Sequence, residues 1–373
     1  LMKLNHIYKS IACGVLLAMT ATSCDLDYNP VDTYSDVTEG VNKTDEKPIF
    51  NSVQDVETSM VTLHKKFRDQ QEHWYVDKLL IGDAHSDNAY AGTTGAEVVP
   101  YETNSIEGSN SVLKRDWDRF LGDIAVANRI IVGCDQLKAL SESERGKYQS
   151  QAKIFRAMVM FDMVRLWGNF PVITTVGGDI TEDNVEEMYP TYFPPQNTAE
   201  EAYAQIEKDL TEAVENPNTP TNDTSDKSIL TKSVARAMLA KVYAEKPLRD
   251  YAKVIKYADE LAADGFDLVE DFSDLWAYDT EKKDCRVRNT KEAILEAHFP
   301  PGSGNWCTWM FGRNLSNWDE SFTWAKWITP SRDLIRLYEE QGDTKRYNES
   351  VVWYDCGWSN YYPADHYAFM YKC

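Results

Sequence analysis

The sequence is poor in positive charge. Its 373 residues carry 39 Lys and Arg against 60 Asp and Glu, which gives a formal net charge of −21. Nucleic acid is therefore not expected as a partner, because binding phosphate requires a basic surface. The same net negative charge disfavours anionic polymers as ligands. Electrostatic repulsion acts locally, so the net charge does not exclude them.

Signatures of metal sites, disulfides and catalysis are also missing. The five cysteines beyond residue 24 are odd in number and lack metal-ligand spacing, so we expect free thiols, with Cys285 and Cys307 as the one pair to examine. The sequence has no H-E-x-x-H motif, no complete EF-hand loop and no G-x-S-x-G motif. Sixty carboxylates make chance acid pairs inevitable, so they do not indicate a glycosidase. We predict no catalytic residues, no metal and no cofactor.

The N-terminus has the organisation of a secretory signal. Lys3 and Lys9 form a basic start, and residues 11–19 form a short apolar region. The sequence A-T-S-C that ends at Cys24 resembles a lipobox, which predicts removal of residues 1–23 and lipidation of Cys24. The alternative is ordinary signal-peptidase cleavage near an incidental cysteine. Residues 24–48 are polar, acidic and turn-rich, which predicts a lipidated, flexible tether.

The stretch 151–173 predicts a central buried helix. A capping box at Ser141 and Glu144 begins it, and the sequence G-N-F-P ends it. The stretch is apolar almost all round, which indicates packing on several sides, and it is too short and too charged to span a membrane. Asp162 and Arg165 are predicted to form a buried structural ion pair within the helix.

Further helices are predicted to begin at Ser52, Thr198 and Thr329, each from its capping pattern. Residues 230–264 resemble a tetratricopeptide repeat, a 34-residue helix pair built on small and aromatic positions. Such repeats make scaffolds. We therefore predict a mostly α fold, in which residues 49–264 form a tetratricopeptide-like, right-handed helical scaffold that carries irregular loop-rich insertions and a few short strands.

Several ordered motifs resemble the RagB/SusD family of outer-membrane nutrient-binding lipoproteins. Residues 151–171 match its main signature, Q-A-x3-R-A-x3-F-x2-V-R-L-x-G-x2-P, with Gln151 in place of the usual glutamate. The patterns W-x6-I-x2-A-N-x-I-I, I-x2-D-L-x2-A and T-P-S-x-D-L-x3-Y-E follow in family order. The resemblance runs from the lipobox to about Tyr347. Family members are usually longer, so we expect the irregular, aromatic-rich region 265–373 to be incomplete at its C-terminus.

The resemblance implies a non-catalytic, surface-exposed protein, lipid-anchored in the outer membrane and facing outwards. Such proteins capture an oligosaccharide or polysaccharide, occasionally a peptide, and deliver it to a SusC-like, TonB-dependent transporter. The implied partners are thus a glycan, the transporter and the membrane. An alternative of another class is a scaffold or adhesion lipoprotein, in which the helical repeats bind a protein and no sugar site exists.

Tryptophans gather in residues 302–327 among glycines and asparagines. Neutral sugars offer apolar ring faces to aromatic side chains, so this stretch is the best candidate for a sugar-binding platform. Taken singly, each tryptophan is more simply interpreted as a packing residue. The candidate contacts are Trp306, Trp309, Trp318 and Trp324.

The loop 81–104 is the second candidate for the ligand side. In the RagB/SusD family this loop often carries an (S/A)-D-N element near the ligand, which Asp87, Asn88 and Tyr90 match here. The alternative is an Asx-rich turn that caps the neighbouring helix.

Overall fold

The computed structural model describes residues 48–91, 98–178, 180, 182, 184–245, 247–275, 278–279, 281–282, 284–301, 328–354 and 367–370. Contacts separate residues 1–48 from residues 49–373, and the description below concerns the second unit. The predicted signal peptide and Cys24 lie outside the described residues.

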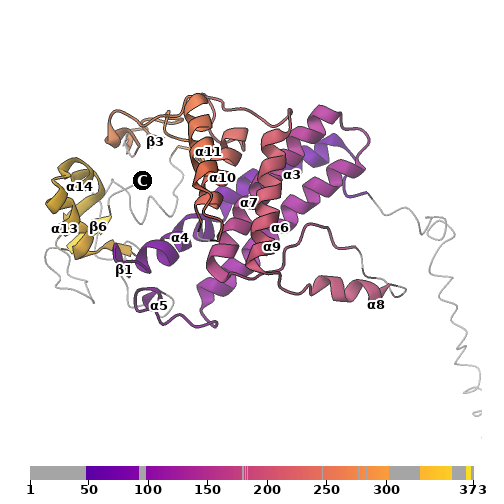
Figure 1. Ribbon diagram of the computed structural model, residues 1–373, viewed down its shortest axis with the longest axis horizontal. Coiled ribbons are helices and arrows are strands. Elements are labelled where there is room, and N and C mark those ends of the chain that lie inside the picture. Colours follow the sequence, from indigo (N-terminus) through magenta and orange to yellow (C-terminus); the bar gives the residue numbers. More distant parts are fainter. Residues whose placement is uncertain are drawn as a thin grey trace, which may run out of the picture. The chain divides into compact units, whose positions relative to one another are not determined.

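The described part of the chain is mostly helical, as predicted (Figure 1). The long helices are α3 (Val53–Asp69), α6 (Ser111–Gln136), α7 (Glu142–Trp167), α9 (Ala199–Glu215), α10 (Lys232–Ala244), α11 (Tyr251–Ala263) and α13 (Arg332–Gln341). The shorter helical segments are η2 (Glu72–Val76), α4 (Asp77–Leu79), η3 (Leu80–Ala84), α5 (Val99–Glu102), α8 (Val185–Met188), η4 (Tyr189–Tyr192), η5 (Phe272–Leu275) and α14 (Thr344–Ser350).

Capping boxes begin the helices where the sequence predicts them. At α7 the amide of Glu144 donates to Ser141 Oγ at 3.2 Å, and the amide of Ser141 donates to the Glu144 carboxylate at 2.9 Å. The same reciprocal pair, Thr198 with Glu201, begins α9. These bonds satisfy amides that have no partner within the helix. Gly168, at φ 71°, ends α7.

The predicted N-cap at Thr329 is wrong. Thr329 lies in a strand, and Ser331 caps α13 because its Oγ accepts a hydrogen bond from the amide of Leu334 at 3.0 Å. A serine two residues after a threonine offers the same chemistry, and pairing of residues 328–330 with another segment decides between them.

Helix α7 is central, as predicted. It packs against α6 and α9, and Figure 1 shows the three running side by side. Its middle is buried on all sides, because α6, α9, α3 and α10 all contact it. The buried apolar side chains of α7 are Ala152, Ile154, Phe155, Ala157, Val159, Met160, Phe161, Met163 and Val164.

The predicted ion pair between Asp162 and Arg165 does not form. Asp162 instead accepts from Lys78 Nζ at 2.6 Å, and Arg165 Nε donates to Glu245 at 3.1 Å. Both side chains point to neighbouring segments, and Arg165 is half exposed. The spacing of Asp162 and Arg165 within one helix therefore predicted the wrong partner for both side chains.

The repeat-like helix pair α10 and α11 forms where residues 230–264 predict it. The two helices pack against each other, and the rings of Tyr243 and Tyr257 stack with centroids 6.1 Å apart. Helix α10 also packs on α9, so the pair extends the helical stack. No helix within the described ranges is both long enough and apolar enough to cross a membrane.

Three two-stranded antiparallel ladders complete the described structure. They pair β1 (Ala89–Ala91) with β4 (Ile328–Pro330), β2 (Tyr278–Asp279) with β3 (Asp284–Cys285), and β5 (Val351–Tyr354) with β6 (Tyr367–Met370). In the first ladder Ala89 faces Pro330 and Ala91 faces Ile328, although 237 positions separate Ile328 from Ala91 (328 − 91). This long-range ladder joins the loop of Asp87 and Asn88 to residues 328–330, which directly follow the tryptophan-rich stretch in the sequence.

Candidate functional site

The loop that holds Asp87, Asn88 and Tyr90 is built around the start of α13. Ser331 donates through its amide to the Asn88 carbonyl at 2.9 Å and through Oγ to the Asp87 carbonyl at 2.5 Å. The Tyr90 hydroxyl accepts from the amide of Arg332 at 3.4 Å. Because Asp87 and Asn88 are held by their main chains, their side chains stay exposed.

The β1–β4 ladder places this loop beside the exit of the tryptophan-rich segment. Strand β4 begins at Ile328, directly after residues 302–327. Trp306, Trp309, Trp318 and Trp324 themselves lie outside the described residues. The structure therefore joins the second candidate region to the end of the first, which no local sequence signal predicts.

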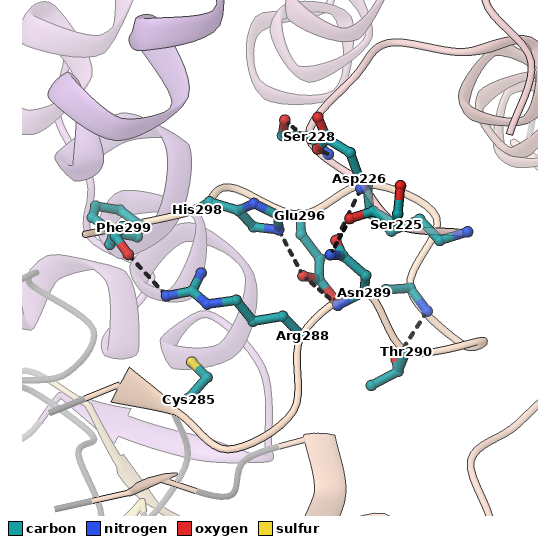
Figure 2. A network of polar contacts seen from close by, with 12 residues as sticks. Ser225, Asp226, Ser228, Cys285, Arg288, Asn289, Thr290, Glu296, His298 and Phe299 are labelled. Atoms are coloured by element: carbon teal, nitrogen blue, oxygen red, sulfur yellow. Dashed lines mark hydrogen bonds and ion pairs between the residues drawn. The ribbon is translucent and has the colours of Figure 1, made fainter. Parts of the chain in front are cut away.

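A network of polar contacts fixes the chain that leads into the tryptophan-rich segment (Figure 2). Asn289 is its centre: Nδ2 donates to the Ser225 carbonyl at 2.7 Å, and Oδ1 accepts from the amide of Lys227 at 2.9 Å. The amide of Asn289 donates to both oxygens of Glu296 at 3.0 Å. Asn289 has a φ of 54°, a left-handed conformation that Asn tolerates better than most residues.

The same network reaches the last described residues before the tryptophans. His298 Nε2 donates to Glu296 at 3.0 Å, and Arg288 donates to the Phe299 carbonyl at 2.8 Å (Figure 2). Arg288 is also paired with Asp284. The Phe299 ring lies against Tyr75, with 6.5 Å between centroids. The described residues on either side of the tryptophan-rich segment are thus anchored, Ile328 in β4 and Phe299 in this network.

A cavity of about 380 Å³ adjoins the network, between α3 and residues 296–298. Its apolar lining includes Met60 and Phe67, and its charged lining residues are Lys65, Arg68 and Glu296. Burial lowers the pKa of His64, whose Nε2 lies 3.2 Å from Gln151 Oε1. The polar lining residues are His64, Lys65, Arg68, Ser228, Glu296 and His298.

A buried acid pair, absent from the sequence-based expectations, lies on the other side of α6. Asp77 and Asp116 are both at most 1 % exposed and are joined by a side-chain hydrogen bond. Burial, with the negative charge of Asp77 next, raises the pKa of Asp116 to about 9, so Asp116 carries a proton at neutral pH. Arg115 forms an ion pair with Asp77. Only the fold brings residues 77 and 116 together, so no local sequence pattern could have found this pair.

The described residues offer little to hold a metal or start covalent chemistry. Among them no group of three or more His, Cys, Asp or Glu side chains could hold a metal ion. Cys134 is a buried free thiol, and burial raises its pKa to about 12. Cys285 is a free thiol as well, so the pairing with Cys307 is not formed. Neither thiol is poised as a nucleophile, because burial also raises the pKa of Cys285.

The described residues thus combine packed helices with short, irregular strand-bearing segments, and similarity to known proteins identifies the family. The family model of SusD-like proteins, described as starch-binding and associating with the outer membrane, matches residues 33–244, which is more than half of the chain. The chain belongs to this SusD-like family, and the resemblance found in its motifs is confirmed.

Individual relatives agree with this assignment. A SusD-like protein of Bacteroides ovatus is 25% identical over 309 residues, which cover 79% of this chain and 50% of the relative. A laminarin-binding SusD-like protein of known structure superimposes with a TM-score of 0.62 at 18% identity, over 86% of this chain and 72% of its own. A SusD superfamily protein of Bacteroides vulgatus gives 0.65 at 16% identity, over 87% and 68%. The chain spans about half the length of the curated relative.

Proposed function

We propose that this protein is a surface-exposed lipoprotein that binds an oligosaccharide or polysaccharide without chemistry and delivers it to a SusC-like, TonB-dependent transporter of the outer membrane. The lipid anchor is Cys24. The sugar platform is the tryptophan-rich segment, with Trp306, Trp309, Trp318 and Trp324, together with the loop of Asp87, Asn88 and Tyr90.

One observation carries the glycan part of the proposal. The pairing of Ala89–Ala91 with Ile328–Pro330 sets exposed Asp87 and Asn88 side chains beside the exit of the tryptophan-rich segment. Sugar recognition uses aromatic faces together with short polar side chains, because a sugar ring is apolar on its face and polar at its edge. Membership of a family described as starch-binding supports the same ligand class.

Isothermal titration against a panel of neutral polysaccharides tests the glycan part. We expect saturable binding of at least one polysaccharide and no release of reducing ends during long incubation. Turnover of any glycan would contradict the non-catalytic part. Alanine at Trp306, Trp309 and Trp318 together is expected to abolish binding and to leave the circular dichroism of the helices unchanged. Unchanged affinity would remove the tryptophan platform.

Exposed aromatics on η4 and directly after it provide a matched control and favour a protein contact. Tyr189 and Phe193 are 56% and 67% exposed, and their ring centroids lie 5.0 Å apart. Tyr192 beside them is half exposed. Exposed apolar patches of this kind are typical of protein interfaces. In the alternative function, a scaffold or adhesion protein, this patch would be the working surface.

A variant with alanine at Tyr189, Tyr192 and Phe193 separates the two functions. We expect it to bind glycan normally and to lose copurification with the transporter from outer membranes. If it loses glycan binding instead, the sugar site lies at this patch and not at the tryptophan platform. If no glycan binds the unaltered protein while a protein partner does, the scaffold function replaces our proposal. Cys24→Ala should release the protein from the membrane fraction, as detected by fractionation and by loss of fatty-acid labelling.

A further inference from the structure

Helix α11 leaves most of its surface uncovered. Among the described elements it packs extensively against α10 alone, and Tyr257 is the one residue of this fully described helix that is buried. The outer helix of a repeat stack ordinarily turns a polar face to water. The apolar residues of α11 are Tyr251, Ala252, Val254, Ile255, Tyr257, Ala258, Leu261, Ala262 and Ala263. An uncovered helix of this composition is typical of an interface.

The exposed apolar residues of α11 form one stripe, which we call the α11 seam: Tyr251, Ile255, Ala258 and Ala262. They follow one another at intervals of four, three and four residues, so they lie on one face of the helix. Tyr251 and Ile255 are 59% and 62% exposed. Alternating intervals of three and four are those of the contact positions in a coiled coil of two helices. The α11 seam therefore fits a second helix.

The charges beside the seam complement a second copy of the same helix. Lys256 and Asp259 lie on one flank of the α11 seam, and both are exposed. In an antiparallel pair, residues before the middle of one helix lie opposite residues after the middle of the other, so each Lys256 faces the partner's Asp259. Each positive N-terminus also lies near the partner's negative C-terminus. A parallel pair would instead set lysine against lysine and aspartate against aspartate.

Lys256 is available for such a contact. Its side chain is 61% exposed, lies 5.0 Å from the Tyr257 ring centre and makes a marginal pair with Glu260 at 3.9 Å. Glu260 already pairs with Arg236 at 2.8 Å, so Lys256 can turn without leaving a carboxylate unpaired. The helix as a whole is neutral, because two lysines balance one aspartate and one glutamate. The repulsion between copies of a chain with a net charge of −21 is thus not concentrated here.

We propose that two copies of this chain associate through antiparallel α11 helices, which continue the helical stack of one copy into that of the other. The seam residues pack across a two-fold axis, and Lys256 of each copy pairs with the partner's Asp259. A helix of 13 residues is about 20 Å long, which is short for a standard interface, so we expect a weak dimer with a Kd on the order of 100 μM. The inference does not depend on the proposed glycan site.

Sedimentation equilibrium of the full chain from about 5 to 500 μM tests this proposal. Cys24→Ala removes the proposed lipid as a cause of association, and a reductant does the same for the exposed thiol of Cys285. We expect the mean mass to rise from that of a monomer towards that of a dimer. A monomer at every concentration, or growth beyond a dimer, would overturn the proposal.

Glutamate in the seam provides a disrupting variant and its matched control. Ile255→Glu places a charge in the middle of the interface and should weaken dimerisation at least tenfold. Val61→Glu makes the same kind of change on α3, where Val61 is 53% exposed, and should leave dimerisation unchanged. Circular dichroism checks that both variants fold. Equal effects of the two changes would place the contact on another surface.

Reversal of the two charges tests the antiparallel arrangement. Lys256→Glu and Asp259→Lys should each weaken dimerisation about tenfold, because each variant alone sets like charges opposite each other twice. An equimolar mixture of the two restores both attractive contacts and should dimerise within about threefold of the unaltered protein. Single variants that dimerise as well as the unaltered protein, or a mixture as weak as its components, would contradict the antiparallel pair.

Discussion

Arg156 of the central helix α7 donates hydrogen bonds to both carboxylate oxygens of Asp209 in α9, through Nε at 2.8 Å and Nη2 at 2.6 Å. The pair is buried, and Arg156 Nη1 also donates to Asn128 Oδ1 of α6 at 2.7 Å. One guanidinium therefore ties three helices together in a fixed planar geometry. The three residues fall in three separate family motifs. The contact shows that these motifs, which are distant in the sequence, meet in one buried cluster of side chains.

Replacement of Arg156 by Met should cost about 3–5 kcal/mol of unfolding free energy, because Asp209 would stay buried without a counter-charge. Urea denaturation at neutral pH measures this. The double variant with Asp209→Leu should recover at least half of the loss. The control is Arg165→Met in the same helix, whose pair with Glu245 is half exposed and should be worth about 0–1 kcal/mol. If the two single variants lost the same unfolding free energy, the buried pair would stabilise the fold no more than the half-exposed one.

Asp116→Asn should stabilise the protein, increasingly so as the pH rises. The pKa of Asp116, raised by burial to about 9, means that the folded state holds a proton that the unfolded state loses near 3.8. Between these values the unfolded state binds fewer protons, so stability falls with rising pH. Asn keeps the hydrogen bond to Asp77 and cannot ionise. We expect a gain on the order of 1–3 kcal/mol at pH 8.

Urea unfolding of both proteins from pH 5 to pH 9 checks this prediction. The groups that face Asp116 are Asp77, Arg115, Arg119 and Tyr101. Asp118→Asn on the same helix is the control, because Asp118 is exposed and pairs only with exposed Lys114 among the described residues. If the unfolding free energies of the unaltered protein and the Asp116 variant varied with pH in parallel, Asp116 would not hold a proton in the folded state.

Asn289 should matter for stability through both its side chain and its backbone. Asn289→Ala loses two hydrogen bonds to the loop 225–227 and forces alanine into a left-handed conformation, which together should cost about 2–3 kcal/mol. Asn289→Gly keeps the backbone relaxed and should cost about 1 kcal/mol less. Thermal unfolding measures both.

Asn104 provides the control, since it is exposed and has the same φ of 54°. Asn104→Ala should show the strain alone, and Asn104→Gly should be nearly neutral. If Asn289→Gly were as neutral as Asn104→Gly, the network in Figure 2 would contribute nothing to anchoring the segment.

Local chemistry made much of the fold predictable. The capping boxes at Ser141 and Thr198 and the helix pair at 230–264 each depend on residues at most a few tens of positions apart. Helix periodicity and caps act over such distances. The mostly helical class followed from these elements and from the family motifs.

Long-range pairing decided the features that the sequence did not predict. Asp162 pairs with Lys78 and Arg165 pairs with Glu245, each on another segment, and not with each other. Thr329 became a strand residue because Tyr90 faces it in the β1–β4 ladder. The buried acid pair of Asp77 and Asp116 depends in the same way on segments tens of residues apart, so its environment exists only in the fold.

The loop of Asp87 and Asn88 has two separable roles, which different substitutions should distinguish. Alanine at both positions leaves their carbonyls, and hence the contacts to Ser331, in place, so the melting temperature should not change while glycan affinity falls about tenfold. Ser331→Ala removes the N-cap of α13 and the bond to Asp87, and should cost about 1–2 kcal/mol of stability. Titration of the glycan that the unaltered protein binds, together with calorimetric melting, measures both. If the double alanine variant melts earlier and binds glycan normally, the loop serves only to cap α13, and the sugar site must be formed without it.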